Sequence, residues 1–245
     1  MTNKYIYFVA NWKMYGGLNS LNSLHKVIDF FKKFRKNKTT KIIYCPPSTL
    51  IRPMAKKLKN SNIEVGAQNC HESETYGAFT GSINSMMLKN VGAKYIIIGH
   101  SENRKLGETN KLINLKIKSA LKSGLKVIFC IGETLSEKRN KIAKKILNKQ
   151  IILGLKKIRP KSKILLAYEP VWSIGTGLIP KSNELFDTVN FIKKKIKNIK
   201  VLYGGSVSSK NIDELKRINN LDGFLIGGAS QESKKFIDII KKTYN

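Results

Sequence analysis

The chain alternates short apolar stretches with longer segments in which apolar residues recur at helical spacing. The short stretches are rich in β-branched residues, as strands are, and none approaches the length of a membrane-spanning helix. There are eight of them, at residues 6–12, 41–47, 63–69, 95–100, 126–133, 164–172, 201–207 and 223–230. The segments between them, such as LNSLHKVIDFFKKF and NELFDTVNFIKKKI, place lysines on a polar face. The pattern predicts alternating strands and helices.

The apolar stretches are nearly continuous, so both faces of each strand are expected to be buried. Parallel sheets covered by helices provide such burial, and eight strand–helix units in 245 residues fit a closed (β/α)8 TIM barrel. A doubly wound open sheet is the alternative fold. No linker, low-complexity tract or change in charge divides the chain, so we expect a single α/β catalytic domain over residues 1–245.

The charge of the chain invites a second interpretation. It carries 46 Lys and Arg residues against 16 Asp and Glu, a net charge of +30, and such an excess is typical of nucleic-acid-binding proteins. Only six of the basic residues are Arg, which suits bidentate contacts to bases and phosphates, and the lysines are spread along helical segments. We expect solvated helix faces and no specific nucleic-acid binding. A barrel whose main role is to bind polyanions remains an alternative.

The cysteines and the start of the chain bear on its location. Cys45, Cys70 and Cys130 are odd in number, lie in or next to apolar stretches and show no Cys-x-x-Cys spacing, which favours reduced core thiols. The apolar segment near the start is too short for a signal peptide. We expect a cytoplasmic protein that does not bind a membrane.

Polar residues and glycines gather where the predicted strands end. In a TIM barrel the active site is built from the loops that follow the carboxyl ends of the strands. The residues found at these ends are Asn11, Lys13, His100, Glu102, Glu169, Ser206, Gly227 and Gly228. Any one of them is consistent with an ordinary solvated loop, but five strands that end in this way favour a shared site.

The residue types fit one kind of chemistry. Glu169 follows a buried strand between aromatic neighbours that would partly exclude water from it, which suits a general base. His100 can polarise a carbonyl or carry a proton, and Lys13 supplies positive charge beside a developing oxyanion. Ser206 and the glycines of GGAS offer N–H groups and a hydroxyl to a phosphate. Together they indicate proton transfer next to a carbonyl in a small phosphorylated substrate.

Motifs for other chemistry fail on inspection. IGTG lacks the third glycine of a dinucleotide site, and no glycine is followed by lysine as in a P-loop. His71 and Glu72 lack the second histidine of a zincin, and His25 falls on a helical segment, where a structural role is expected. We therefore expect no cofactor and no metal.

Seven motifs, in order along the whole chain, resemble the triosephosphate isomerase family: NWKMYGG, GAFTG, IIIGHSENR, CIGETL, AYEPVWSIGTG, VLYGGSV and LIGGAS. The resemblance implies a homodimeric barrel that interconverts dihydroxyacetone phosphate and D-glyceraldehyde 3-phosphate through an enediolate-like intermediate. It also implies a place in glycolysis and gluconeogenesis. A different phosphate-handling barrel enzyme is the remaining alternative.

The resemblance also assigns roles to individual residues. Glu169 would be the base, His100 a neutral electrophile and Lys13 an electrostatic stabiliser. Residues 170–177 would form a lid over the phosphate, with Glu102 behind the site. The expected substrate contacts are Asn11, Lys13, Gly175, Ser206, Gly227 and Gly228.

Two positions depart from the family pattern. Asn103 stands where the family usually carries Arg, and Ser82 stands where Glu is common. Both fall in segments that the resemblance places near the dimer interface, so the catalytic matches are unaffected.

Overall fold

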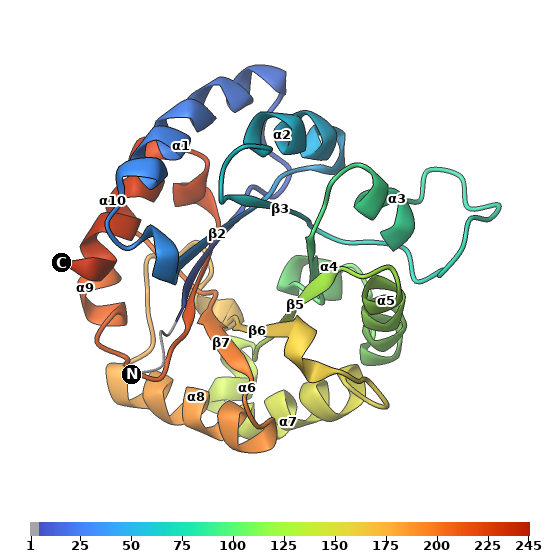
Figure 1. Cartoon of the computed structure of the whole chain (residues 1–245). Helices are drawn as coiled ribbons and strands as arrows, with labels where there is room; N and C mark the ends of the chain where they lie inside the picture. The colour runs from blue at the N-terminus through green and yellow to red at the C-terminus, as the bar shows by residue number, and fades with distance from the viewer. Residues whose placement is uncertain (1–4) are drawn as a thin grey trace.

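The computed structural model describes residues 5–245 and shows eight parallel strands closed into a barrel (Figure 1), which confirms the predicted fold. Each strand pairs with the next along the chain, and β1 also pairs with β8 to close the ring. The strands are β1 Ile6–Asn11, β2 Thr40–Cys45, β3 Glu64–Ala67, β4 Tyr95–Ile98, β5 Lys126–Ile131, β6 Ile164–Tyr168, β7 Lys200–Tyr203 and β8 Gly223–Ile226.

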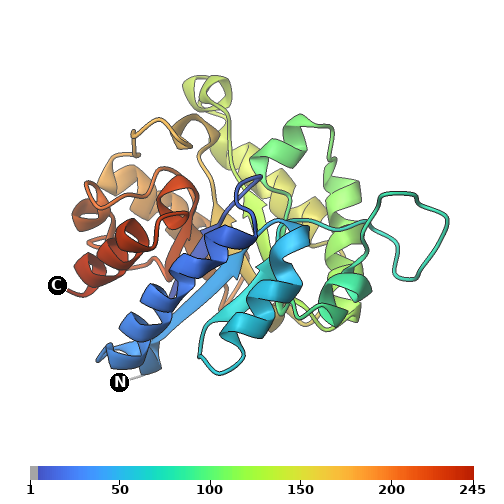
Figure 2. The same cartoon turned by 90° about the horizontal axis from the view of Figure 1, so that it is seen from above.

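The helices form a ring outside the strands (Figures 1 and 2). The α-helices are α1 Leu24–Lys33, α2 Ile51–Leu58, α3 Ser85–Asn90, α4 Ser101–Lys105, α5 Asn110–Lys122, α6 Leu135–Arg139, α7 Ala143–Gly154, α8 Ser182–Lys195, α9 Ile212–Leu215 and α10 Ser233–Tyr244. Short 3₁₀ turns are η1 Leu18–Ser23, η2 Asn37–Thr39, η3 Ser48–Leu50, η4 Lys161–Lys163, η5 Val171–Ser173 and η6 Gly228–Ser230.

The strands are buried on both faces because alternate residues point into the barrel and out toward the helices. On β1, Val9 joins a core made of strand residues inside the barrel, together with Ile43 and Leu225. Its neighbours Phe8 and Ala10 belong to the larger core between strands and helices. This double burial explains why the sequence shows continuous apolar runs.

The helices are amphipathic, as their spacing predicts. On α1, Leu24, Val27 and Phe31 lie three and four residues apart and are buried against the barrel. Lys32 and Lys33 follow in the last turn, and both are exposed. Their positive charges stabilise the carboxyl end of the helix, where the helix dipole is negative.

All strands run in the same direction, so their carboxyl ends meet at one end of the barrel. The pairing aligns Asn11 with Cys45 and Tyr168 with Tyr203 at this end. The loops that carry the predicted site residues therefore converge there.

The segment at residues 69–84 differs from the other connections. It projects well beyond the ring of helices in both views (Figures 1 and 2). It exposes Tyr76 and Phe79, whose exposed fractions are 63% and 50%.

Among residues 5–245, no helix combines the length and the apolar character needed to cross a membrane.

Candidate active site

A cavity of about 260 Å³ lies at the carboxyl ends of the strands. Its lining comes from the loops after β1, β4, β6, β7 and β8, and it includes all of the catalytic and substrate-binding residues predicted from the sequence: Asn11, Lys13, His100, Glu169, Gly175, Ser206, Gly227 and Gly228. Residues separated by more than 200 positions in the chain thus line the same cavity.

Glu169 follows β6 and is only 1% exposed. Its Oε2 accepts a hydrogen bond of 3.2 Å from the backbone N–H of Ser101, whereas its buried Oε1 accepts none from residues 5–245. Gly204 makes room for the side chain, because a Cβ there would lie 2.8 Å from Glu169 Cγ. The side chain lines the cavity, and one of its carboxylate oxygens has no hydrogen bond from residues 5–245, which suits a group that takes up a proton.

His100 lies directly before α4 and caps that helix. Its Nδ1 accepts a hydrogen bond of 3.2 Å from the backbone N–H of Glu102. An imidazole nitrogen that accepts from an N–H carries no proton, so this hydrogen bond places the ring hydrogen on Nε2. This Nε2 lies 3.3 Å from Oε1 of Glu169. The cavity thus holds an imidazole donor beside a carboxylate.

Lys13 is held in a backbone conformation that residues other than glycine rarely adopt, with φ of +53°. Its N–H donates to Asn11 Oδ1 at 3.1 Å, and its carbonyl accepts from Gln68 Nε2 at 2.8 Å. Gln68 also donates to the carbonyl of Cys45, at 2.8 Å. These side chains fix the strained backbone that places the lysine in the cavity.

The ammonium of Lys13 is paired with a carboxylate. Its Nζ donates to Oε1 of Glu102 at 2.5 Å. Burial acts to raise the pKa of Glu102, but the hydrogen bond from Lys13 and the positive charge outweigh it, so this pKa lies below its ordinary value. The pair keeps one positive charge at a defined place in the cavity.

Backbone and small side chains form another part of the lining. Gly227 lies next to Lys13, because a Cβ there would be 3.5 Å from Lys13 Cε, and a Cβ at Gly228 would meet nothing within 4 Å, so the backbone at Gly228 is open to a ligand. Ser230 Oγ donates to the carbonyl of Gly227 at 2.6 Å, and Asn211 Nδ2 donates to that of Ser206 at 3.0 Å. Protein donors thus occupy these two carbonyls, and the N–H of Ser206 donates to Ser173 Oγ at 3.2 Å, so an anion that binds this N–H must replace Ser173 as its acceptor.

The predicted lid follows Glu169. Its Trp172 donates through Nε1 to Oε1 of Glu133 at 3.0 Å, and the Tyr168 hydroxyl donates to the same oxygen at 3.1 Å. Lys138 places its Nζ 4.0 Å from the centre of the Trp172 ring. Residues of β6, of α6 and of the loop between β5 and α6 thus hold the base of this lid.

We expect replacement of Glu133 by Gln to change the pH dependence of stability. Burial raises the pKa of Glu133, although the hydrogen bonds from Trp172 and Tyr168 oppose this effect. A carboxyl whose pKa is raised by folding stabilises the fold at low pH and loses that contribution as the pH rises above its ordinary value of 4.5. Thermal unfolding should therefore show Glu133→Gln gaining stability relative to the wild type as the pH rises. A difference in Tm that is constant with pH would contradict this.

Several residues of the site were not found from the sequence. Gln68 and Glu133 act on Lys13 and Trp172 through contacts between distant loops, and no spacing in the chain signals them. Ile174 and Leu225 add apolar surface to the cavity. The position of Leu225 could have been predicted from the alternation of β8, because Leu225 faces the inside of the barrel while Phe224 and Ile226 face the helices.

No group of three or more His, Cys, Asp or Glu side chains in the described part of the chain is arranged to hold a metal ion. The polar groups of the cavity are a carboxylate, an imidazole, an ammonium, amides and backbone N–H groups. This set suits a small anionic substrate.

The comparisons with known proteins point to one family. The family model described as triosephosphate isomerase matches residues 6–243. The chain is 39% identical to the triosephosphate isomerase of Thermodesulfovibrio yellowstonii, over 98% of this chain and 100% of that protein. It is 40% identical to that of Dictyoglomus thermophilum, over 95% of this chain and 97% of that protein.

A solved structure agrees with these relatives. The crystal structure of triosephosphate isomerase from Bartonella henselae superposes with a TM-score of 0.88 at 32% identity, and the match covers 98% of this chain and 99% of that one. The chain therefore belongs to the triosephosphate isomerase family and is an enzyme that isomerises triose phosphates.

Proposed function

We propose that Glu169, His100 and Lys13 carry out the isomerisation. Glu169 takes a proton from the carbon next to the substrate carbonyl, and an enediolate-like intermediate forms. The same carboxyl then returns the proton to the neighbouring carbon, while the hydroxyl proton of the first carbon moves to the former carbonyl oxygen, so the ketose becomes the aldose without a change in oxidation state overall. The observation that carries this proposal is the buried carboxylate of Glu169 in the cavity lining, whose Oε1 has no hydrogen bond from residues 5–245 and lies 3.3 Å from Nε2 of His100.

His100 assists at the oxygen atoms of the substrate. Its neutral ring, with the hydrogen on Nε2, donates to the carbonyl oxygen as negative charge develops there. The hydrogen bond that Nδ1 accepts from Glu102 N–H supports this role, because it fixes both the tautomer and the orientation of the ring.

Lys13 stabilises the developing oxyanion by its charge. It lies on the same cavity wall as Asn11, whose side chain fixes its backbone. An ammonium held in place before the reaction needs no reorganisation as charge develops, which is why a fixed lysine contributes more than a mobile one.

The phosphate of the substrate is proposed to bind the N–H groups of Ser206, Gly227 and Gly228. Gly175 would complete this contact from the lid, residues 170–177. Gly175 lines the cavity while the rest of the tip is exposed, and we expect the tip to move over the bound phosphate. Closure would exclude water and protect the enediolate from losing phosphate.

Isomerisation in D₂O tests the proton-transfer mechanism. If Glu169 exchanges its proton with solvent while the intermediate exists, glyceraldehyde 3-phosphate formed from dihydroxyacetone phosphate gains deuterium at C2. Mass spectrometry or NMR of the product measures this label. Product that carries no deuterium, even after long incubation with the enzyme in D₂O, would favour direct hydride transfer and contradict the proposal.

The enzyme is further proposed to be a homodimer. The projecting segment at residues 69–84 exposes Tyr76 and Phe79, and the loop after β1 exposes Met14 at 93% and Tyr15 at 58%. Apolar surface of this kind is costly in water unless a partner covers it. In the dimer that the family resemblance implies, Thr80 at the end of this segment reaches the neighbouring active site.

The two departures from the family pattern provide a test of the dimer. Asn103→Arg alone is expected to be neutral or harmful, because it adds a charge without its partner. Adding Ser82→Glu should recover the loss, with a coupling of about 0.5 to 3 kcal/mol. Thermal unfolding of the wild type, both single variants and the double variant measures the coupling, and sedimentation measures the assembly. Additive effects would refute the pairing, and an active monomer would refute the dimer.

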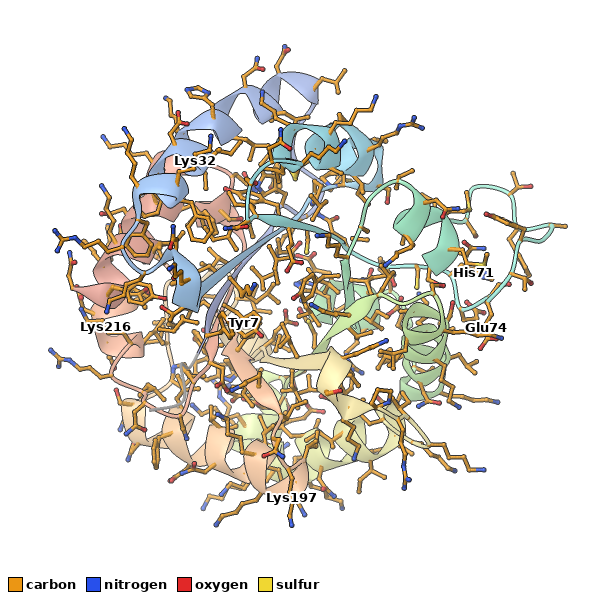
Figure 3. The ribbon with its side chains drawn as sticks, in the orientation of Figure 1. Tyr7, Lys32, His71, Glu74, Lys197 and Lys216 are labelled. Carbon is orange, nitrogen blue, oxygen red and sulfur yellow. The ribbon has the colours of Figure 1, made fainter. Side chains whose placement is uncertain are left out.

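The positive charge is proposed to serve solubility rather than specific nucleic-acid binding. Lys32, Lys197 and Lys216 lie far apart around the ring of helices (Figure 3), which supports positive charge dispersed over the surface and not one binding face. The cysteines Cys45, Cys70 and Cys130 are buried free thiols, which supports a cytoplasmic location.

We propose that residues 1–245 act as one catalytic domain, since the barrel closes only when β1 pairs with β8.

A further inference from the structure

The hydroxyl of Ser173 connects the lid to two other parts of the cavity wall. It is fully buried, with 0% exposure. Its Oγ donates to the carbonyl oxygen of Leu178 at 2.6 Å, and it lies 2.9 Å from the hydroxyl of Tyr203. It also accepts a hydrogen bond of 3.2 Å from the backbone N–H of Ser206. One side chain therefore joins both ends of the lid tip to β7 and to the loop that follows β7.

These contacts use the whole bonding capacity of the hydroxyl. A serine hydroxyl has one hydrogen and two lone pairs. The Leu178 carbonyl only accepts and the Ser206 N–H only donates, so the Tyr203 hydroxyl must donate to Ser173. The backbone leaves space for this node at Gly205, where a Cβ would lie 2.6 Å from Ser173 Oγ. The node is thus fully satisfied and sterically enclosed.

The position of the node determines what it restrains. Ser173 ends η5 and directly precedes Ile174 and Gly175, which line the cavity. Leu178 follows the tip, and residues 175–178 are exposed. The bond between Ser173 and Leu178 closes this tip into a short loop, and the bond to Tyr203 ties the loop to the barrel.

A bound phosphate would compete with Ser173 for one of these bonds. The N–H of Ser206 has a single hydrogen, and in the structure it points to Ser173 Oγ. The phosphate proposed to bind this N–H is a charged acceptor, and hydrogen bonds to ionised acceptors are stronger than those to a neutral hydroxyl. Phosphate binding therefore removes one of the three partners of Ser173.

We propose that Ser173 is a positioning residue that latches the lid in the position seen in this structure, and that the phosphate of the substrate weakens the latch by taking the N–H of Ser206. This inference rests on the phosphate contacts proposed above. An anion in the cavity makes lid movement easier, because it reduces the bonds of Ser173 from three to the two with Leu178 and Tyr203.

Ser173→Ala tests the latch. A lid freed from the latch reaches the cavity at a lower cost, so a ligand that binds the closed form binds more tightly. The inhibition constant of inorganic phosphate and the KM for glyceraldehyde 3-phosphate should both fall by about 2- to 12-fold, the equivalent of one net hydrogen bond, while kcat does not rise. If Ser173 had only a structural role, its replacement by Ala would lower Tm and leave both the inhibition constant and the KM unchanged.

Ser85→Ala is the matched control. Ser85 is also fully buried, and its hydroxyl also contacts three partners, but it lies on α3 outside the cavity. It should lose stability without any change in phosphate inhibition. Ser173→Cys, which keeps the shape but bonds weakly, should shift phosphate binding in the same direction as Ser173→Ala by a smaller factor.

The outcomes separate the latch from the proposed function. If the wild type is active and inhibited by phosphate, but neither Ser173 variant binds phosphate more tightly, the latch is refuted and the phosphate site stands. If phosphate does not compete with substrate in the wild type, the proposed phosphate contacts fail and the latch fails with them. Tighter binding in the Ser173 variants, with the Ser85 control unchanged, supports both.

Discussion

Replacing Glu169 with Gln is expected to lower kcat by at least about 10² to 10⁴-fold, the usual contribution of a positioned acid or base. Glutamine keeps the size of the side chain and an acceptor for the Ser101 N–H, which donates to Glu169 Oε2 at 3.2 Å. It cannot take up a proton. The loss should therefore appear in turnover, with the fold and the cavity retained.

A glutamate elsewhere on the barrel provides the matched control. Glu64 lies at the start of β3, at the opposite end of the barrel, and its carboxylate is 3.6 Å from Lys94 Nζ. Glu64→Gln makes the same chemical change on a strand without touching the cavity, so kcat should stay at the wild-type value. Steady-state assays in both directions, with circular dichroism to check folding, measure the effect. Near-normal turnover in Glu169→Gln would remove Glu169 from the role of base.

The architecture could be predicted because its determinants are local and repeated. A strand that is buried on both faces has apolar residues at successive positions, so it forms a continuous apolar run in the sequence. Each of the eight runs coincides with a strand of the barrel. The helices show their buried face in the spacing of residues such as Leu24, Val27 and Phe31. Closure follows from the number of units, because the eighth strand can pair with the first only in a ring.

The lining of the cavity was predictable for the same reason: parallel strands all end at one face. His100 and Glu169 are far apart in the chain, yet each follows a strand directly, and the barrel brings them together. The supporting contacts were not predictable. Gln68 holds Lys13, and Ser173 joins Leu178 to Tyr203, through pairings that depend on how separate loops pack.

The sequence also could not show which nitrogen of His100 faces the substrate. The residue type alone allows either ring nitrogen to accept a hydrogen bond. The choice follows from the N–H of Glu102, which donates to Nδ1 because α4 begins at the residue after His100. This contact depends on the orientation of the ring at the helix start, which the spacing of residues does not give.

Replacing Lys13 with Met should lower kcat/KM by about 10² to 10³-fold, the range seen when one stabiliser of a developing oxyanion is removed. Methionine approximates the length and the apolar stem of lysine and removes only the charge and its hydrogen bonds. The backbone should stay in place, because Asn11 and Gln68 bond to the main chain of residue 13 and not to its side chain. Lys94→Met, which removes an exposed lysine paired with Glu64 at the far end of the barrel, is the matched control and should keep full activity.

The same substitution should change how stability depends on pH, which separates the charge of Lys13 from its shape. The hydrogen bond from Lys13 helps to hold the pKa of Glu102 below its ordinary value of 4.5, against the effect of burial. A carboxyl with a lowered pKa stabilises the fold above its ordinary pKa and loses that contribution as the pH falls through the folded value. Lys13→Met removes this contribution, so its deficit in Tm should be greatest at neutral pH and should shrink below about pH 4.5. A deficit that is the same at neutral and acid pH would mean that the ion pair with Glu102 does not contribute. Full activity in Lys13→Met would refute the electrostatic role itself.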